Sequence, residues 1–481
     1  MTALTYKPVI GLEVHVQLSA KSKLFADDSA AYGLPPNTSI SVITLAHPGT
    51  LPKLNRVAVD YAVKLGLACG CEIAREFYFD RKNYFYPDLP KGYQITQHRT
   101  PVCKGGAVPV RMPDGTIRSI LLNRIHLEED AGKSIHDSER TETLLDFNRA
   151  GVALLELVTE PVIHSAEEAG AFLSEIRKLV RYLEISDGNM EEGSLRCDAN
   201  VSVMPEGSTQ LGKKVEIKNL NSIRFVQQAI SAEIKRQTTL LEARMKIKSE
   251  TRLYDPASGK TFPMRTKEEL NDYRYFPEPD LSPVMLSNHW VQSVKSSLPE
   301  LPWQRVEKFM AHYGLPLYDA LVLTETRELA DYFETVCRQT SNFKAVSNWI
   351  MGPIKSHRND NPGTGFPLSA SLLAELIGLV ETNQVSFSVA SQKIFPELIK
   401  NPSKTAQQVA QQLNVMQETN AEVILQVILG VLNDYSQKVN EYKKGKKGIM
   451  AMFMGEVMKR TQGKADPKLA TELLRKQLEN Q

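Results

Sequence analysis

Cysteine is scarce in this sequence. Its 481 residues include five cysteines, Cys69, Cys71, Cys103, Cys197 and Cys337, and only the first two lie close together, as C-G-C. An odd number spread over a long chain does not suit a disulfide framework, and no second close pair completes the four ligands of a zinc site. We therefore expect reduced thiols and a cytoplasmic protein.

Long hydrophobic runs are also missing. The most apolar stretch after the N-terminus, AEVILQVILGVL, is interrupted by Gln426, and it is shorter than the roughly 20 apolar residues that a membrane span needs. The N-terminus, MTALTYKPVIGLEVHV, runs directly into a strand pattern without the apolar core of a signal peptide. The sequence therefore predicts an unexported protein that does not associate with membranes.

An excess of charge of one sign is absent as well. Lysine and arginine number 58 and aspartate and glutamate 56, a formal net charge of +2, so the total charge excludes no class of partner. One segment departs from this balance, because residues 441–481 contain ten basic and five acidic residues. Such a segment suits contacts with a nucleic-acid backbone, but a solvated helical face would have the same composition.

The composition is otherwise that of a globular protein, with 42% hydrophobic and 24% charged residues. A chain of this length is expected to form two to four domains. Strand patterns mixed with a few helices extend from about residue 7 to residue 287, and almost only helical patterns follow residue 298. The sequence thus predicts an α+β fold, divided into residues 1–294, 295–402 and 403–481.

Several helices are marked by their start signals and apolar stripes. Ser165 and Glu168 have the spacing of a capping box, and Asp466 before Pro467 is typical of a helix N-cap. Two stripes recur at helical spacing: Phe172, Ile176, Leu179, Val180 and Leu183, then Ile223, Val226, Ile230, Ile234 and Leu241. We expect both stripes to pack against a sheet.

The strand patterns carry the chemically informative residues. In VIGLEVHVQL, alternation turns Glu13 and His15 to one face. The opposite face is apolar and consists of Ile10, Leu12, Val14, Val16 and Leu18. A carboxylate and an imidazole are therefore expected side by side on a face whose reverse is buried.

Four further strands each present a carboxylate. RIHLEED turns His126, Glu128 and Asp130 to one face, and VALLELVTEP is apolar except for Glu156, which needs a cation or hydrogen-bond donors if it is buried. The remaining two carboxylates lie in SLRCDANVSV and KKVEIKNLN and are Asp198 and Glu216.

Two interpretations of this polar face are open. A sheet with one solvated side would also alternate. However, Glu, Asp and His are concentrated here, and Mg²⁺ prefers carboxylate oxygens together with phosphate oxygens of a substrate. His15 is an unusual Mg²⁺ ligand and suits either a hydrogen bond or a softer second metal.

The letters Gly132-Lys133-Ser134 resemble the end of a phosphate-binding P-loop. That motif requires a glycine five positions before Gly132, where Leu127 stands. The strand pattern also runs through this region, so the sequence excludes a P-loop here.

A basic and aromatic segment, FDRKNYFYPDLPKGYQIT, extends from Phe79 to Thr96. Arg81 and Lys82 stand next to several tyrosines and phenylalanines, a combination that suits a phosphate and a stacked base. A packed aromatic loop with charges at its surface explains the same residues.

The motifs together resemble a known family. V-I-G-L-E-V-H, F-D-R-K-N-Y-F-Y-P-D, H-L-E-E-D-A-G-K-S, M-E-E-G-S-L-R-C-D-A-N and D-Y-R-Y-F-P-E-P-D occur in this order over residues 9–280. They are similar to the B subunit of the tRNA-dependent Asp/Glu amidotransferase, the GatCAB enzyme. The helical remainder, with G-E-V-M-K at residues 455–459, resembles the helical and tail domains of the same family.

The resemblance implies a cradle-like catalytic domain, a helical domain and a small helical tail that binds tRNA. It implies a ligase that forms a C–N bond with glutamine as amido donor, as a heterotrimer with the amidase (A) subunit of that enzyme and its small (C) subunit. The substrates would be misacylated Glu-tRNA(Gln) and Asp-tRNA(Asn), and the cofactors ATP and Mg²⁺. A non-catalytic tRNA-binding scaffold within the same complex is the alternative, and a stand-alone ATP-grasp-like ligase lacks its glycine-rich loop here.

The resemblance also implies site residues. The metal ligands would be Glu13, His15, Glu128, Glu156 and Asp198. The catalytic residues would be Glu13, His15, Lys82 and Glu128, and the nucleotide contacts Arg81, Lys82, Ser194 and Arg196. One departure concerns zinc, because the segment that carries zinc-binding cysteines in some family members contains no cysteine here, so no structural zinc is expected.

Overall fold

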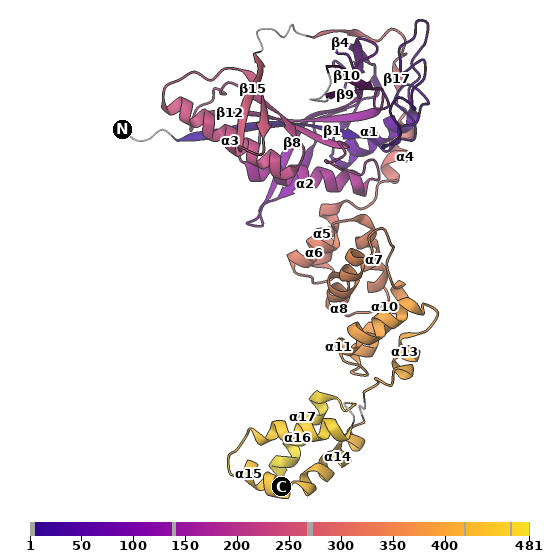
Figure 1. The fold of residues 1–481 in the computed structure, drawn as a ribbon, viewed down its shortest axis with the longest axis vertical. Coiled ribbons are helices and arrows are strands. Elements are labelled where there is room, and N and C mark those ends of the chain that lie inside the picture. Colours follow the sequence, from indigo (N-terminus) through magenta and orange to yellow (C-terminus); the bar gives the residue numbers. More distant parts are fainter. Residues whose placement is uncertain (1–4, 137–140, 267–272, 418–419, 462–463, 481) are drawn as a thin grey trace. The chain divides into compact units, whose positions relative to one another are not determined.

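The computed structural model describes residues 5–136, 141–266, 273–417, 420–461 and 464–480. Residues 1–304 and 305–481 form two compact units, and each has its own fold. The first unit combines a large sheet with helices and the second is helical in its described part, so the predicted α+β class is confirmed (Figure 1). The predicted division into three domains stays a prediction.

The first unit is built on a mixed, mainly antiparallel sheet. From one edge to the other its strands are β15 (Lys260–Thr266), β14 (Glu250–Asp255), β13 (Val215–Leu220), β12 (Leu195–Pro205), β1 (Tyr6–Gln17), β11 (Ala153–Thr159), β8 (Ile117–Glu129), β6 (Cys103–Lys104) and β2 (Glu72–Ile73). A further strand, β7 (Ala107–Arg111), pairs with β8 outside this order. The strands that carry the predicted site residues, β12, β1, β11 and β8, are therefore direct neighbours in the middle of the sheet.

Three smaller sheets complete the strands of this unit. They consist of β16 (Arg274–Pro277), β4 (Asp80–Asn83) and β5 (Tyr93–Thr96), of β9 (Lys133–His136) and β10 (Thr143–Asp146), and of β3 (Glu76–Phe77) and β17 (Val284–Met285). The helices of the unit are α1 (Arg56–Ala68), α2 (Ala166–Tyr182), α3 (Ile223–Glu242) and α4 (Asn288–Ser296).

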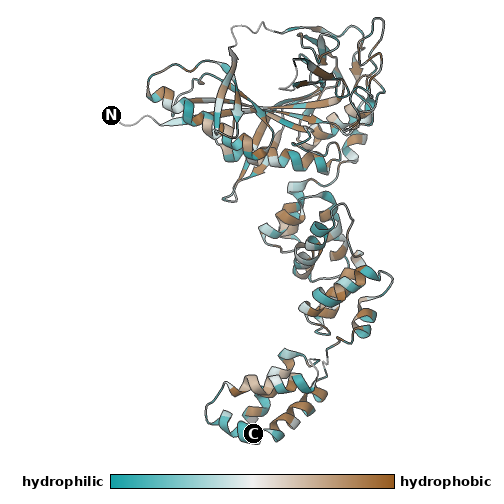
Figure 2. Cartoon of the chain, in the orientation of Figure 1, coloured by the Kyte–Doolittle hydropathy of each residue, from teal (hydrophilic) through white to brown (hydrophobic). Residues whose placement is uncertain are grey.

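The core of the first unit lies between one face of the large sheet and α1, α2 and α3. The alternation predicted for β1 is confirmed, because Ile10, Leu12, Val14 and Val16 have no exposed surface. The helices that run along the sheet show hydrophobic and hydrophilic residues in alternation (Figure 2). The opposite face of the sheet carries the polar residues and is left available for a site.

The start of α2 differs in one detail from the prediction. Ser165 is the N-cap, since its Oγ accepts a hydrogen bond from the backbone N–H of Glu168. The Glu168 carboxylate, however, accepts from the N–H of His164 at 2.8 Å rather than from that of Ser165. The predicted capping box is therefore only half formed, while the predicted cap of the last helix by Asp466 is confirmed.

The second unit consists of helices in its described part. They are α5 (Pro302–Ala311), which begins at the end of the first unit, α6 (Leu317–Leu323), α7 (Arg327–Cys337), α8 (Phe343–Trp349), η2 (Ile350–Ile354), α9 (Lys355–Asp360), α10 (Ala370–Glu381), α11 (Phe387–Val389), η3 (Ala390–Ile394), α12 (Phe395–Lys400), α13 (Ala406–Gln412), α14 (Ala421–Asp434), α15 (Ser436–Lys443), α16 (Ile449–Arg460) and α17 (Pro467–Asn480). Separate hydrophobic cores form within residues 306–410 and within residues 424–478. Within the described ranges, no helix is both long enough and apolar enough to cross a membrane.

The cysteines are free and buried, which confirms the prediction of reduced thiols. Four of them, Cys69, Cys71, Cys103 and Cys197, lie in the core of the first unit. The Cys71 thiol donates a hydrogen bond to the carbonyl oxygen of Gly105 at 2.9 Å. The turn that holds this contact contains two adjacent glycines with positive φ, Gly105 at 62° and Gly106 at 90°.

These two glycines give a matched test of the packing. A Cβ at Gly106 would lie 2.6 Å from Cys71 Sγ and 2.7 Å from the Cys69 carbonyl oxygen, whereas a Cβ at Gly105 meets nothing within 4 Å. Both Gly→Ala changes strain the backbone, but only Gly106→Ala also overpacks the core, so it should lower the free energy of unfolding by about 1–3 kcal/mol more than Gly105→Ala does. Urea unfolding of both variants measures the difference, and equal losses would contradict this packing.

Candidate functional site

Three predicted site residues meet in the middle of the polar face of the sheet. His15 Nε2 lies 3.4 Å from Glu128 Oε1 and 3.3 Å from Glu156 Oε2. One ligand atom from each of the three residues fits within 4.8 Å of the others, and in the described part of the chain this is the only such group. We call His15, Glu128 and Glu156 the central cluster.

Strand pairing explains why these residues meet. His15 on β1 is opposite Glu156 on β11, and Glu156 is in turn opposite His126 on β8. Glu128 follows two residues later on β8, opposite Leu154, and therefore points to the same face. The cluster thus combines three neighbouring strands that are far apart in the sequence.

The central cluster combines one positive group, His15, with two negative groups, Glu128 and Glu156. Burial lowers the pKa of His15, but its hydrogen bonds and charge interactions with Glu128 and Glu156 outweigh this effect and raise the pKa to about 10. Burial raises the pKa of Glu128, whereas His126 and His15 together hold it well below its ordinary value. The two carboxylates are therefore ionised and require a positive partner, which a divalent cation would also supply.

The chemistry of the donor atoms fits a divalent cation. Two carboxylates and the imidazole of His15, which would lose its proton to a cation, leave further coordination positions for water or substrate oxygens, an arrangement that suits Mg²⁺ and Mn²⁺ with phosphate substrates. The side chains of Glu128 and Glu156 are 5% and 14% exposed, so both carboxylates are held in place by packing.

Glu13 and Asp198 lie on the same face but outside the central cluster. They are opposite each other on β1 and β12. Asn200 donates a hydrogen bond to Glu13 Oε1 at 2.8 Å, and Lys218 Nζ lies 2.7 Å from Asp198 Oδ2. The structure therefore brings three of the five predicted metal ligands together, and their assignment as ligands stays a prediction.

The other two carboxylates of the E-E-D triplet have separate partners. Glu129 is buried, pairs with Lys91 and accepts a hydrogen bond from the N–H of Ile95 at 2.8 Å, which ties β5 to β8. Asp130 Oδ2 lies 2.7 Å from Arg196 Nη2 and 3.5 Å from Arg149 Nε. Of the triplet, Glu128 is therefore the one carboxylate in the central cluster.

Arg81 on β4 holds a loop through ion pairs. Its guanidinium contacts Glu278 at 2.7 and 2.8 Å and Asp280 at 2.9 Å, and it lies 4.2 Å from the centre of the Tyr93 ring. Glu278 has a fully buried side chain, so these contacts are part of the packing. The prediction that Arg81 contacts a nucleotide remains a prediction.

Lys82 points away from Arg81, as expected for the next residue of a strand. Its Nζ lies 4.7 Å from the centre of the Tyr273 ring and 5.6 Å from that of Tyr84. Tyr275, which is opposite Lys82 on β16, stacks on His98 at 4.1 Å between ring centres. Lys82 of the basic and aromatic segment therefore lies among aromatic side chains, and we call Tyr84, Tyr273, Tyr275 and His98 the aromatic wall.

Ser194 and Arg196 lie at the start of β12 beside a large cavity. This cavity has a volume of about 670 Å³, and its lining includes Lys133, Arg149, Arg196 and Asp198. Arg196 is directly opposite His15 in the sheet, so the cavity borders the central cluster. Ser194 is buried and lies between Gly193 and Leu195, which line the cavity.

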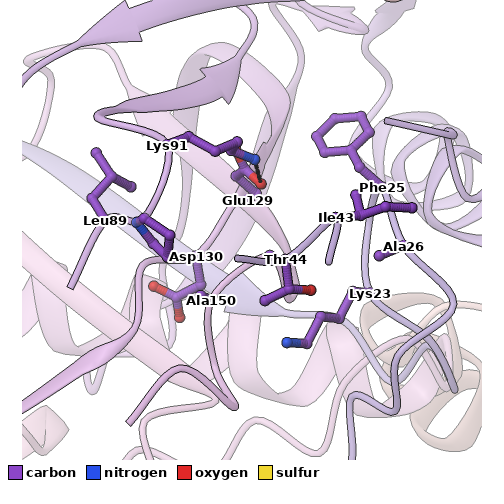
Figure 3. Close-up of a pocket in the computed structure, with 12 residues that line it drawn as sticks. Lys23, Phe25, Ala26, Ile43, Thr44, Leu89, Lys91, Glu129, Asp130 and Ala150 are labelled. Atoms are coloured by element: carbon purple, nitrogen blue, oxygen red, sulfur yellow. Dashed lines mark hydrogen bonds and ion pairs between the residues drawn. The ribbon is translucent and has the colours of Figure 1, made fainter. Parts of the chain in front are cut away.

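A second, much smaller cavity of about 20 Å³ lies next to Glu129 (Figure 3). Lys23, Lys91 and Asp130 are among the residues around it. Lys23 is fully buried, and its Nζ donates a hydrogen bond of 3.4 Å to the carbonyl oxygen of Phe147. The cavity has room for one water-sized molecule.

The buried Lys23 gives a pH-dependent prediction. Burial lowers its pKa from 10.5 to about 8, although Asp28 and Asp146 act in the opposite direction. Between pH 8 and 10.5 the unfolded chain therefore binds more protons than the folded one, and stability rises with pH. Relative to Lys23→Met, the wild type should gain about 3 kcal/mol of unfolding free energy across this range. A difference between the two proteins that stays constant with pH would contradict the prediction.

Two residues of the site were not predicted. His126 Nε2 lies 3.7 Å from Glu128 Oε2 and 3.6 Å from Glu156 Oε2, and the alternation in RIHLEED already turned it to this face. Lys218 lies between Asp198 and Glu216, at 2.7 and 3.2 Å. Its partner on β12 could not be found from the sequence, because it depends on which strands pair.

The fold and the site together define an α+β protein whose central sheet carries an acidic, histidine-containing cluster beside a large cavity lined by both basic and acidic side chains. Comparison with known proteins agrees with this description. A family described as the GatB/GatE catalytic domain matches residues 8–292, and one described as the GatB domain matches residues 331–478.

Similar proteins extend over nearly the whole chain. A relative from Thermodesulfovibrio yellowstonii is 47% identical over 98% of this chain and 99% of its own length. Relatives from Thioalkalivibrio sulfidiphilus and Salinibacter ruber are 46% and 47% identical, over 99% and 98% of this chain and 100% and 97% of their own lengths. Each of the three is named as the B subunit of an aspartyl/glutamyl-tRNA(Asn/Gln) amidotransferase. The chain belongs to this GatB family, as its motifs predicted.

Proposed function

We propose that this chain activates the side-chain carboxylate of a misacylated tRNA with ATP and then replaces the phosphate by ammonia. The substrates would be Glu-tRNA(Gln) and Asp-tRNA(Asn), in keeping with the names of the relatives. The amidase (A) subunit would release ammonia from glutamine, and the small (C) subunit would complete the heterotrimer. Because aminoacyl-tRNAs are used in the cytoplasm, the complex would work there.

The observation that carries this proposal is the central cluster. The buried carboxylate of Glu128, the half-buried one of Glu156 and the imidazole of His15 meet at one point on the sheet, and a Mg²⁺ ion held by them would neutralise charge on the phosphate oxygens of ATP. A scaffold that only binds tRNA would gain nothing from negative charge in this position. The acidic cluster therefore favours chemistry over passive binding.

The reaction consists of two displacements. An oxygen of the substrate carboxylate attacks the γ-phosphorus of ATP, the bond from that phosphorus to the bridging oxygen breaks, and ADP leaves. The ammonia nitrogen then attacks the carbonyl carbon of the acyl phosphate, the carbon–oxygen bond to phosphate breaks, and a proton passes from nitrogen to the released phosphate. Such a sequence needs positioning and charge neutralisation but no nucleophilic side chain.

The cavity next to the cluster suits the nucleotide. Its volume of about 670 Å³ lies in the range of small-molecule sites. Arg149 and Arg196 line it, and both are fixed by Asp130. Guanidinium groups are well matched to phosphate oxygens, so Arg196 and the nearby Ser194 would contact the nucleotide. Lys82 would lie on the opposite wall of the site.

Reconstitution of the heterotrimer tests the proposed function. The complex should cleave ATP only when Mg²⁺ and a misacylated tRNA are both present, and it should form Gln-tRNA(Gln) or Asn-tRNA(Asn) when glutamine is added. Uncharged tRNA and Gln-tRNA(Gln) serve as controls that lack the reacting carboxylate. Amidation that proceeds without ATP cleavage, or a complex that binds tRNA without either reaction, would favour the scaffold role instead.

A further inference from the structure

Arg124 lies on the polar face of the sheet but has no part in the site described so far. It precedes His126 on β8 by two residues and therefore points to the same face. In the sheet it is opposite Val158 on β11. Its place is thus two same-face positions along β8 from Glu128 of the central cluster, with His126 between them.

The strand is distorted at this point. Val158 is opposite Arg124, but the next residue, Thr159, is opposite Leu122, so Asn123 is an extra residue in β8. The side chain of Asn123 donates a hydrogen bond to Glu160 Oε1 at 2.8 Å, which holds the bulge. β-bulges change the direction of a neighbouring side chain and often occur next to active sites.

One donor of the Arg124 guanidinium is left unsatisfied by the described residues. Its Nε is shielded from solvent and has no hydrogen-bond partner among the described residues. Arg81 and Arg196 each pair with a carboxylate, Glu278 and Asp130, although the Nε of Arg196 is likewise buried without a partner among the described residues. A buried donor without a partner costs free energy and therefore calls for an acceptor from outside the chain.

The surroundings of Arg124 indicate where such an acceptor would lie. The pKa of Tyr275 is raised, first by burial, while the positive charges of Lys82 and Arg124 act against this and Glu156 adds to it. The charges of Arg124, Lys82 and Glu156 thus act on the same hydroxyl, and Lys82 is the residue opposite Tyr275 in the pairing of β4 with β16. We call Lys82 and Arg124 the basic pair. It lies on the side of the central cluster that the aromatic wall bounds.

Arg124 and the cavity-lining Arg196 lie at opposite ends of the row of four strands that carries the polar face. Arg196, which lines the cavity, is on β12, and Arg124 is on β8, with β1 and β11 between them. Transfer of a phosphoryl group requires the attacking and leaving oxygens to be roughly in line on opposite sides of the phosphorus. A nucleotide in the cavity therefore leaves the Arg124 side for the attacking group.

We propose that Arg124 binds the side-chain carboxylate of the aminoacyl group on the misacylated tRNA. A guanidinium donates charge-assisted hydrogen bonds to a carboxylate. Bonds to one oxygen hold the carboxylate while its other oxygen attacks the γ-phosphorus, the bond from that phosphorus to the bridging oxygen breaks, and ADP leaves. The assignment rests on the proposed function, and it makes Arg124 the residue that distinguishes a carboxylate substrate from its amide product.

Binding measurements without ATP test this assignment, because they need no turnover. In the heterotrimer with Mg²⁺, the wild type should bind Glu-tRNA(Gln) about 10- to 100-fold more tightly than Gln-tRNA(Gln), the range for a hydrogen bond to a charged group. Arg124→Gln should bind the two tRNAs equally. The matched control is Arg118→Gln on the same strand, whose side chain is 55% exposed and 3.5 Å from Glu168, and it should discriminate like the wild type.

The outcomes separate this assignment from the proposed function. If the wild type cleaves ATP as expected but Arg124→Gln still prefers Glu-tRNA(Gln), the assignment is wrong and the proposed function stands. If Arg124→Gln keeps its preference but loses affinity for ATP or inorganic phosphate, Arg124 contacts phosphate and the assignment is again wrong. A wild-type complex that discriminates but never cleaves ATP would refute the proposed function and leave the carboxylate contact supported.

Discussion

Replacing Glu128 by glutamine is expected to lower the rate of tRNA-dependent ATP cleavage about 10²–10³-fold. The substitution keeps the size of the side chain but removes one of the two charges that the central cluster offers to a cation. Because the Glu128 side chain is 5% exposed and lies 3.4 Å from His15 Nε2, no other described carboxylate is placed to substitute for it. The rate constant in the reconstituted heterotrimer, measured at saturating ATP and misacylated tRNA, gives the result.

A matched variant controls for the loss of one negative charge. Glu72 is exposed and lies on β2 at the edge of the large sheet, so Glu72→Gln should cleave ATP at the wild-type rate. Both variants should form the complex, since the shape of each side chain is kept, and urea unfolding of Glu128→Gln separates any loss of stability from the loss of rate. A Glu128→Gln variant that retains a near-normal rate would remove Glu128 from the chemistry.

Replacing Phe172 by alanine is expected to lower the free energy of unfolding by about 3–5 kcal/mol. Phe172 lies on α2, has no exposed surface, and belongs to the core between the helices and the large sheet. The change removes most of a large side chain and leaves a cavity that the surrounding strands cannot fill. Urea unfolding of the full chain measures the loss.

The control for this stability change is a phenylalanine at the surface. Phe85 is 84% exposed, so Phe85→Ala should change the free energy of unfolding by no more than about 0.5 kcal/mol. If the two variants lost similar stability, the helix stripe that contains Phe172 would not be the packing face that the structure describes.

The sequence predicted the elements of the site better than their contacts. Period-two alternation placed Glu13, His15, Glu128 and Asp198 on polar faces, and the structure has each of them on one side of the large sheet. Alternation is a local property, because successive side chains of any strand point to opposite faces. It therefore needs no knowledge of the strand order.

The ion pairs of the site could not be predicted because they depend on that order. β1 lies between β12 and β11 in the sheet, and no local pattern places strands so distant in the sequence next to each other. The Arg81–Glu278 pair joins residues 197 positions apart, and the Lys91–Glu129 pair joins residues 38 positions apart. The sequence showed that these residues are charged, but not which charges compensate one another.

The same reasoning explains why Arg124 was overlooked. Arg124 is the first residue of RIHLEED, and the carboxylates of this motif are the residues that indicate a metal site. An arginine on a strand is commonly paired with a carboxylate, so its residue type alone indicates no function. Only the structure shows that its Nε is buried without a partner among the described residues and that a bulge at Asn123 lies directly beside it. The missing partner is a property of packing and cannot be read from composition or spacing.

Direct measurement of cation binding tests the central claim, that the polar face of the sheet holds a divalent cation. The heterotrimer is titrated with Mn²⁺ by calorimetry in the absence of ATP and tRNA, as the wild type and as Glu128→Gln, Glu156→Gln and the control Glu72→Gln. We expect a binding event in the wild type and the control that is lost or weakened at least about 10-fold in the two cluster variants. Identical titration curves for all four proteins would contradict the account.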